Sequence, residues 1–400
     1  MISVLLLVGV AVAVFVGFNI GGSSTGVAFG PAVGSGVLSK LGAAVLMASF
    51  ALLGGWTVGR NVVATMGGKI VPSALFTLPA SVGVLFFVGL ALLVSNLFGV
   101  PASTSMTAVG AIAGLGVAAG DIDWGVMGQI VSWWLVAPIV AFWVCAVIGR
   151  YLYPYLDVWF RIDQSEGPLF EYDRVASIPY PVPAANTNRR ELVSSVLVVV
   201  IGCYMAFSAG ASNVANAVAP LVGSGELQIN QGILLAAGAI ALGAFTIARR
   251  TLDTVGNDLT DLPLLAALIV EVVSASLITF LSYLGIPASL AVSATMCIIG
   301  LGWGRATRAV RVRDAAAAAV RGDGEKTKKA DGESKMSVDA LTAEPEDEVQ
   351  KIGEEDPDEL QTKDLFDPSS TGRVIMLWIL TPSISAVASF LLFEFFPIYQ

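Results

Sequence analysis

The fold of this chain is decided by the stretch Ser208-Ala-Gly-Ala-Ser-Asn-Val-Ala-Asn-Ala-Val-Ala-Pro-Leu-Val-Gly-Ser-Gly225, which follows an apolar run long enough to enter a membrane. Small residues let backbones approach closely, and the amides of Asn213 and Asn216 would be costly in hydrocarbon without a polar neighbour. A polar, Gly-rich, non-helical segment is tolerated at membrane depth only where it packs in protein or lines a wetted cavity. The stretch therefore predicts a binding segment inside a membrane.

The composition predicts an all-α integral membrane protein, since 55% of the 400 residues are hydrophobic and 13% are charged. The run from Ile2 to Ile20 is expected to be the first span, with a cleaved signal peptide as the alternative. Histidine is absent and the three cysteines lie far apart in apolar runs. These features argue against an enzyme, a metal site or a disulfide.

The chain repeats itself. Gly21 and Gly210 are 189 residues apart, and the same offset relates Arg60 to Arg249. Further on the offset becomes 186 and pairs Gly99-Val-Pro-Ala-Ser103 with Gly285-Ile-Pro-Ala-Ser289. Interrupted hydrophobic segments at matching places in two halves indicate the substrate site of a transporter.

The repeat gives a domain plan with about five crossings per half, by the rule of roughly 20 residues per span. An odd number inverts the second half; an even number, with parallel halves, is the alternative. Arg and Lys concentrate in the loops at 150–190, 248–260 and 305–372, which predicts that these loops are cytoplasmic and that both termini lie outside. The expected parts are a first membrane repeat (1–149), an inter-repeat cytoplasmic linker (150–190), the main part of the second repeat (191–304), an acidic and disordered cytoplasmic loop (305–372), and a final helix that completes the second repeat (373–400).

Two motifs carry a resemblance to a known family. Gly210-Ala-Ser-Asn-Val-Ala-Asn-Ala217 resembles the Gly-Ala-Asn-Asp-Val-Ala-Asn-Ala signature of the inorganic phosphate transporter (PiT) family, and Pro101-Ala-Ser-Thr-Ser105 resembles its Pro-Val-Ser-Thr-Thr element. The likeness extends from about Phe18 to Trp303. It implies an inverted-repeat secondary transporter with discontinuous helices and re-entrant segments. It also implies a homodimer in the plasma membrane that moves phosphate inward by symport with sodium or protons and binds no nucleic acid.

The chain departs from that pattern at its carboxylates. The second copy reads Ser212-Asn213 where the family has Asn-Asp, and the first copy reads Ser23-Ser24 with Val27 in place of the later Asn. Loss of both signature acids weakens a cation site and removes a titratable group. Glu271 is the carboxylate well inside an apolar run, so it is a candidate replacement site for a proton or cation. The alternative for Glu271 is a helix that faces a wet vestibule.

The hydroxyls and amides of the motifs suit an anion, because neutral donors and helix N-termini can replace its water. Half-helices are expected to begin after Gly22, Pro101, Gly210 and Pro287, each contributing roughly half a positive charge. The substrate-binding candidates are Ser23, Ser24, Thr25, Ser103, Thr104, Ser105, Ser212, Asn213, Asn216 and Ser289. The candidates for a coupling cation or proton are Asn213, Ser24 and Glu271.

Four functions follow from these features. The leading one is a secondary carrier of inorganic phosphate. The second is a carrier of sulfate or another oxyanion, since loss of the paired Asp residues favours a changed substrate or coupling ion. A site that keeps an acceptor such as Asn213 or Glu271 would prefer phosphate, because phosphate can donate a hydrogen bond and sulfate cannot at neutral pH. The third, from another class, is a transporter-derived anion sensor whose loop at 305–372 binds a partner. A membrane enzyme is the weakest, because no catalytic machinery is visible.

Overall fold

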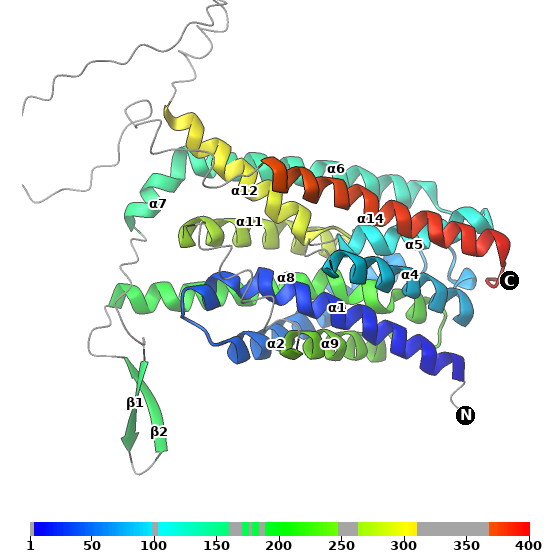
Figure 1. The fold of residues 1–400 in the computed structure, drawn as a ribbon, viewed down its shortest axis with the longest axis horizontal. Helices are drawn as coiled ribbons and strands as arrows, with labels where there is room; N and C mark the ends of the chain where they lie inside the picture. Colours follow the sequence, from blue (N-terminus) through cyan, green and yellow to red (C-terminus); the bar gives the residue numbers. More distant parts are fainter. Residues whose placement is uncertain are drawn as a thin grey trace, which may run out of the picture.

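The computed structural model describes residues 4–97, 103–159, 170–175, 178–183, 189–246, 263–309 and 368–400. Helices form its membrane part, in two successive sets (Figure 1). The first set comprises α1 (Val4–Gly34), α2 (Lys40–Thr57), α3 (Gly59–Met66), a 3₁₀ turn (Ser73–Leu75), α4 (Leu78–Leu97), α5 (Thr104–Ala119), α6 (Trp124–Val147), a π-helical turn (Ile148–Leu152) and α7 (Tyr153–Trp159). The second comprises α8 (Arg189–Gly223), α9 (Ile229–Thr246), α11 (Leu264–Tyr283), α12 (Leu290–Ala306), a 3₁₀ turn (Thr307–Ala309) and α14 (Pro368–Phe395).

The linker between the two sets contains an element that the sequence did not predict. Beyond α7, strands β1 (Phe170–Val175) and β2 (Ile178–Pro183) pair antiparallel as a hairpin that projects from the helices in Figure 1. The all-α prediction included no strand in this linker. Pro179, Pro181 and Pro183 lie in β2, and the Ile, Tyr and Val that alternate with them favour a strand. The all-α prediction therefore holds for the membrane-spanning part.

Each half supplies five apolar helices. Eight of the described helices are long and apolar enough to cross a membrane, and α5 and α12 are shorter apolar helices of 16 and 17 residues. In chain order, α1, α2, α4, α5 and α6 correspond to α8, α9, α11, α12 and α14. This agrees with the expected number of crossings per half.

The two halves are inverted with respect to one another. Gly202 of α8 lies against Phe29 near the end of α1, whereas Gly9 near the start of α1 lies against Leu221 near the end of α8. The two helices therefore run antiparallel, and Figure 1 shows both chain termini at the same end of the bundle. The prediction of an inverted repeat is confirmed, and parallel halves are excluded.

Glycines bring the first helix of each half into backbone contact with the second helix of the other half. A Cβ added at Gly21 of α1 would collide with the carbonyl oxygen of Ile240 in α9. A Cβ at Gly210 of α8 would collide with the carbonyl oxygen of Ala51 in α2. These pairs are related by the 189-residue offset, so the same close packing is built twice.

The short helices α5 and α12 each pack on a helix of the other half. A Cβ at Gly114 of α5 would strike the carbonyl oxygen of Ala386 in α14, and one at Gly300 of α12 would strike that of Phe142 in α6. The hydroxyl of Ser389 in α14 also donates to the carbonyl of Ala111 at 2.7 Å. The last helix of each half thus packs on the short helix of the other.

The structure corrects one expectation about the motif segments. Helices α1 and α8 run continuously through Gly21–Ser24 and through Ser208–Gly223, so neither segment is non-helical or re-entrant. The hydroxyl of Thr25 donates to the carbonyl of Gly21 at 2.7 Å, within its own helix. Close packing against neighbouring helices, rather than unwinding, explains the small residues. The discontinuity lies instead between α11 and α12, where Leu284–Ser289 is non-helical and Gly285 has a φ of +74°.

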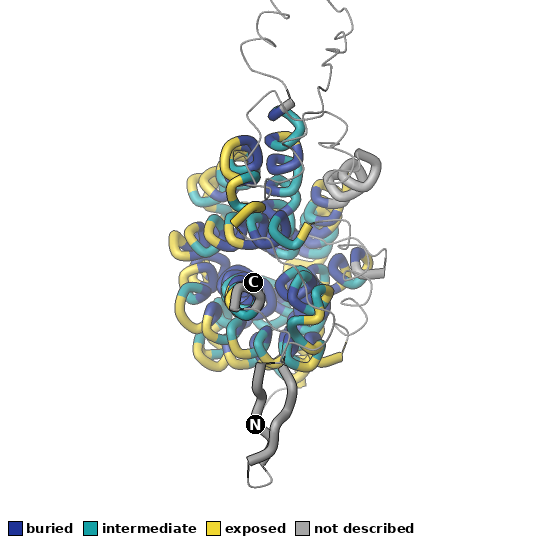
Figure 2. Tube along the Cα trace, turned by 90° about the vertical axis from the view of Figure 1, so that its left-hand side faces the viewer, coloured by how far each residue is buried: buried dark blue, intermediate teal, exposed yellow. Residues whose placement is uncertain are grey.

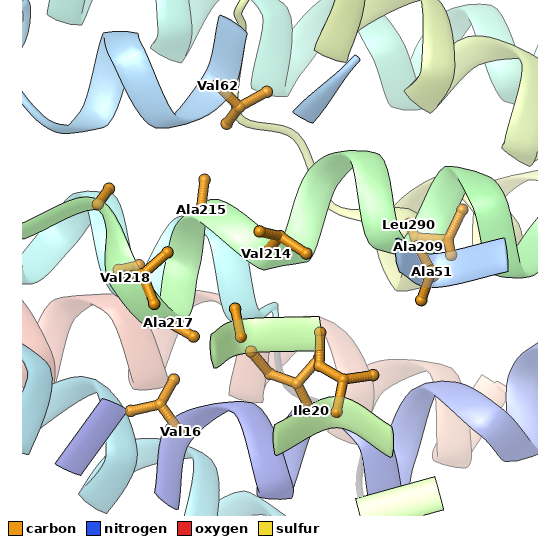
Figure 3. Close-up of a cluster of buried hydrophobic side chains, with 14 of the residues drawn as sticks. Val16, Ile20, Ala51, Val62, Ala209, Val214, Ala215, Ala217, Val218 and Leu290 are labelled. Carbon is orange, nitrogen blue, oxygen red and sulfur yellow. The ribbon is translucent and has the colours of Figure 1, made fainter. Parts of the chain in front are cut away.

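Helix α8 forms the centre of the bundle. In Figure 2 buried residues face the interior and exposed residues face outward, as expected for helices surrounded by lipid. Figure 3 shows Val214, Ala215 and Val218 of α8 in the same hydrophobic cluster as Ile20 of α1 and Val62 of α3. Polar side chains on α8 are therefore held in a protein interior, away from lipid.

Candidate functional site

Four of the predicted site residues form one polar cluster between α5 and α8. The Thr104 hydroxyl donates to Asn213 Oδ1 at 2.5 Å. Asn216 Nδ2 lies 3.2 Å from Thr104 Oγ1, 3.1 Å from Ser105 Oγ and 3.0 Å from Asn213 Oδ1. We call these four residues the amide–hydroxyl cluster.

The hydrogen-bonding capacity of the cluster is unevenly used. An amide oxygen has two lone pairs, and both of those on Asn213 Oδ1 are taken, by Thr104 and by Asn216. Asn216 Nδ2 has two hydrogens for its three neighbours. Asn216 Oδ1 is buried and has no hydrogen-bond partner, and the same is true of Ser212 Oγ one turn away on α8. Asn216 Oδ1 and the Ser212 hydroxyl are thus available for hydrogen bonds to a ligand, next to side chains that already bond to one another.

The start of α5 adds positive potential to the cluster. Ser103 is the N-cap, with its hydroxyl oxygen accepting from the Met106 amide at 3.4 Å, so Thr104 and Ser105 occupy the first two helical positions. Amides at these positions have no intrahelical partner, and the helix dipole favours negative charge there. Ser289 caps α12 in the same way through the Val292 amide at 3.3 Å. Helices α5 and α12 therefore begin where half-helices were predicted, after Pro101 and Pro287. The starts predicted after Gly22 and Gly210 lie instead in the middle of α1 and α8.

The equivalent position in the other half is largely apolar. The repeat offsets place Ser24 and Val27 where α8 has Asn213 and Asn216, and place Leu290 and Ala291 where α5 has Thr104 and Ser105. Figure 3 shows Leu290 in the hydrophobic cluster with Ala51 and Ala209. The polar cluster therefore exists in one of two pseudo-symmetric places.

The remaining predicted residues lie apart from the cluster's hydrogen bonds. Ser23 is half-buried and its hydroxyl donates to the Asn19 and Ile20 carbonyls at 3.3 and 3.1 Å. Thr25 is buried and bonded within α1, and Ser24 is half-buried. Hydroxyls that bond back to their own helix are less available to a ligand. Glu271 of α11 is buried, and its Oε1 has no hydrogen-bond partner.

Two residues that sequence reasoning missed secure the break before α12. Trp134 Nε1 of α6 donates to the carbonyl of Pro287 at 2.8 Å, and Asn61 Nδ2 of α3 donates to that of Tyr283 at 2.8 Å. Both donors come from the first half and satisfy carbonyls that the break leaves without helical partners. The available signals were an Asn in the short segment after α2 and a Trp near the centre of the α6 span.

The capping role of Ser103 gives a first prediction. We expect Ser103→Ala to lower stability by about 1 kcal/mol, because the N-cap hydroxyl is lost. Its effect on anion affinity should be smaller than that of a change at Thr104. Thermal unfolding and anion binding in detergent measure the two effects, with Ser103→Thr as the control that keeps the cap. A loss of affinity without loss of stability would assign Ser103 to the ligand instead.

Comparison with known proteins identifies the group to which this arrangement belongs. The sequence profile of the phosphate transporter family matches residues 20–389, which include both copies of the motif and the amide–hydroxyl cluster. The chain belongs to the phosphate transporter family. Its resemblance to the inorganic phosphate transporters is thereby confirmed, and its relatives are transporters rather than enzymes.

Individual members of the phosphate transporter family differ in their named substrates. Sulfate permease CysP of Bacillus subtilis is 30% identical over 297 residues, covering 74% of this chain and 77% of the permease. A Chlamydia muridarum protein, whose name marks it as a provisional phosphate permease, is 26% identical over 386 residues, covering 75% of this chain and 89% of that protein. A solved structure titled "The sodium-dependent phosphate transporter" superposes with a TM-score of 0.68 at 16% identity and covers all of both chains, which shows the shared fold.

Proposed function

We propose that this protein carries a tetrahedral oxyanion, in the first place inorganic phosphate, across the plasma membrane by alternating access between its two inverted halves. The observation that carries the proposal is the amide–hydroxyl cluster, in which Thr104, Ser105, Asn213 and Asn216 meet at the start of a helix inside the bundle. These are neutral donors beside a helix N-terminus, the combination that binds a desolvated anion without a counter-charge.

The cluster would bind an anion by exchanging hydrogen bonds. Thr104 has a single hydroxyl hydrogen, which it gives to Asn213 Oδ1. An anion oxygen near the α5 N-terminus would take that hydrogen in place of the amide oxygen. A hydrogen bond to an ion is roughly twice as strong as one between neutral groups, so the exchange favours the bound anion.

The open acceptor in the cluster supports phosphate. Monohydrogen phosphate carries a proton that it can donate, and the buried, unpartnered Asn216 Oδ1 is an acceptor for it. Sulfate has no such proton and would leave this oxygen unpaired. Sulfate remains the second candidate because the 30% identical relative is named a sulfate permease and no described carboxylate lies in the cluster.

Uptake into proteoliposomes tests the proposal. Labelled phosphate and labelled sulfate are offered under a sodium gradient, under a proton gradient and with no gradient. We expect saturable phosphate uptake that exceeds sulfate uptake. Sulfate uptake without phosphate uptake would select the second candidate. Binding of both anions without movement under any gradient would favour the transporter-derived sensor, whose partner-binding loop at 305–372 lies mostly outside the described residues.

Several further features belong to the same proposal. Sodium is a candidate coupling ion, since the solved structure with the same fold is titled as sodium-dependent. The proposal also includes the division of the chain into a first half at 1–149 and a second half at 191–304 with 373–400. The linker at 150–190 would be cytoplasmic, both termini would lie outside, and the protein would be a homodimer in lipid. Ser23, Ser24, Thr25, Ser212 and Ser289 would contribute donors in conformations other than this one.

The missing signature carboxylate can be restored at one position. We expect Asn213→Asp to weaken anion binding about 10-fold or more, because a carboxylate accepts the Thr104 proton more strongly and repels the anion. It should also increase the dependence of transport on sodium, because the restored carboxylate is an anionic oxygen ligand for a cation. Asn213→Ser, which matches Ser24 in the other half, is the neutral control. Equal affinity in Asn213→Asp and the unaltered protein would show that position 213 does not face the anion.

A further inference from the structure

Glu271 is a buried carboxyl group that the anion site does not use. Its side chain is 4% exposed, and Oε1 has no hydrogen-bond partner. The other acidic side chains that the structure describes, such as Asp123 and Glu394, are exposed at helix ends. An ionised carboxylate without a partner costs several kcal/mol in the interior, so a carboxyl group in such an environment is a candidate site for a proton.

The position of Glu271 follows from its neighbours on α11. Ser274 Oγ lies 3.9 Å from Met205 Sδ of α8, and the carbonyl of Ala275 accepts from Ser208 Oγ at 3.0 Å. Residues three and four positions apart share one helix face, so Glu271 lies on the face of α11 that packs on α8.

Glu271 is therefore separate from the amide–hydroxyl cluster, but its helix packs on α8, which carries Asn213 and Asn216. Met205, beside Ser274, precedes Asn213 by eight positions on α8, which corresponds to roughly 12 Å at 1.5 Å per residue. In the first half the equivalent position of α4 is Leu85, which is fully buried. The carboxyl group thus occurs in one half only.

The titratable groups on the elements packed against α11 leave Glu271 without a described counter-ion. Helix α1 has none in Val4–Gly34. Arg60 of α3 bonds to Trp56 and Asn230, and Arg305 of α12 stacks on Tyr153. The other titratable side chains described on α6, α8 and α12 are Cys145, Cys203, Tyr204, whose hydroxyl donates to Ser276, and Cys297.

We propose that Glu271 is the coupling-proton site of this transporter, an inference that rests on the proposed oxyanion transport. The carboxyl group takes a proton from one side of the membrane, crosses between states as the neutral acid, and releases the proton to the other side as water reaches it. The proton is gained and lost once per cycle, so the carboxyl returns unchanged. Each proton carried with a dianion cancels one negative charge, and moving one charge through 100 mV costs about 2.3 kcal/mol. A carboxyl in this position replaces the acids that both motif copies lack.

The test separates net, gradient-driven accumulation from exchange in proteoliposomes. Accumulation of labelled phosphate or sulfate is driven by an imposed gradient of about one pH unit, which supplies roughly 10-fold accumulation per coupled proton. Exchange of labelled for unlabelled anion requires no net proton movement. We expect Glu271→Gln to lose the pH-driven accumulation and to keep exchange within about 2-fold, while Glu271→Asp keeps part of the accumulation. Glu394→Gln, at an exposed position of α14, is the control and should keep both.

Three outcomes would overturn the inference. The first is undiminished pH-driven accumulation by Glu271→Gln. The second is accumulation by the unaltered protein that follows sodium and ignores pH. The third comes from infrared spectroscopy, which needs no transport. It is a spectrum of the unaltered protein that shows no protonated-carboxyl band beyond those also present in Glu271→Gln. If neither anion is exchanged while that band is present, the proposed function fails and the proton site stands.

Discussion

Replacing Gly210 with alanine is expected to destabilise the protein more than any other single methyl addition in α8. The added Cβ would collide with the carbonyl oxygen of Ala51, and backbone atoms cannot move aside as a flexible side chain can. Overpacking of this kind costs about 1–3 kcal/mol, and a backbone collision belongs at the upper end. The thermal unfolding midpoint in detergent should fall, and the variant should elute less uniformly in size-exclusion chromatography.

A matched control is available in the neighbouring helix. Gly238 of α9 has no atom within 4 Å of an added Cβ, so Gly238→Ala introduces the same methyl group without a collision. Alanine is also the better helix former, by roughly 0.8–1 kcal/mol in water. We expect this variant to be as stable as the unaltered protein or slightly more so. Equal unfolding midpoints for the two variants would contradict the close approach of α8 and α2.

Replacing Thr104 with valine is expected to have the largest effect on anion binding for a change that preserves shape. Valine removes the hydroxyl that donates to Asn213 and accepts from Asn216, and so removes a donor at the α5 N-terminus. A hydrogen bond to a charged group contributes about 1.5–3 kcal/mol, which corresponds to roughly 10- to 100-fold in affinity. The dissociation constant for phosphate, measured by calorimetry on purified protein, should rise accordingly.

Thr107→Val is the control for this measurement. Thr107 lies one turn further along α5 and is buried, and its hydroxyl donates to the Ser103 carbonyl at 2.9 Å. The same isosteric change there should alter anion affinity little. An effect at Thr107 as large as that at Thr104 would indicate a general weakening of α5 rather than the loss of a donor to the anion.

The architecture could be predicted from the sequence because duplication and hydropathy are strong signals. The offsets that pair Gly21 with Gly210 and Ser103 with Ser289 gave the two halves, and an odd number of apolar runs gave their inversion. The helix starts after Pro101 and Pro287 were also predicted, whereas the N-cap roles of Ser103 and Ser289 were not.

The conformation of the motif segments could not be predicted in this way. A run of Gly, Ala and Ser has the same composition whether it unwinds or packs a helix against a carbonyl, and only the partner decides between them. For Gly210 the partner is Ala51, which lies 159 residues earlier in the chain. Likewise, Asn213 and Asn216 were expected at the site, but their direct bonds to Thr104 and Ser105 required the placement of α5 against α8.

The interleaving of α5 with α14 has a consequence for how the chain is made. Helix α5 leaves the ribosome early, yet the carbonyls that its glycines rest on belong to Pro382 and Ala386, near the end of the chain. Helix α5 is also short for a free span, at 16 residues. During synthesis α5 is therefore made well before α14, the helix on which its glycines pack. A nascent chain stopped before α14 would carry Thr104 and Ser105 on a helix that lacks the packing partner of Gly110 and Gly114.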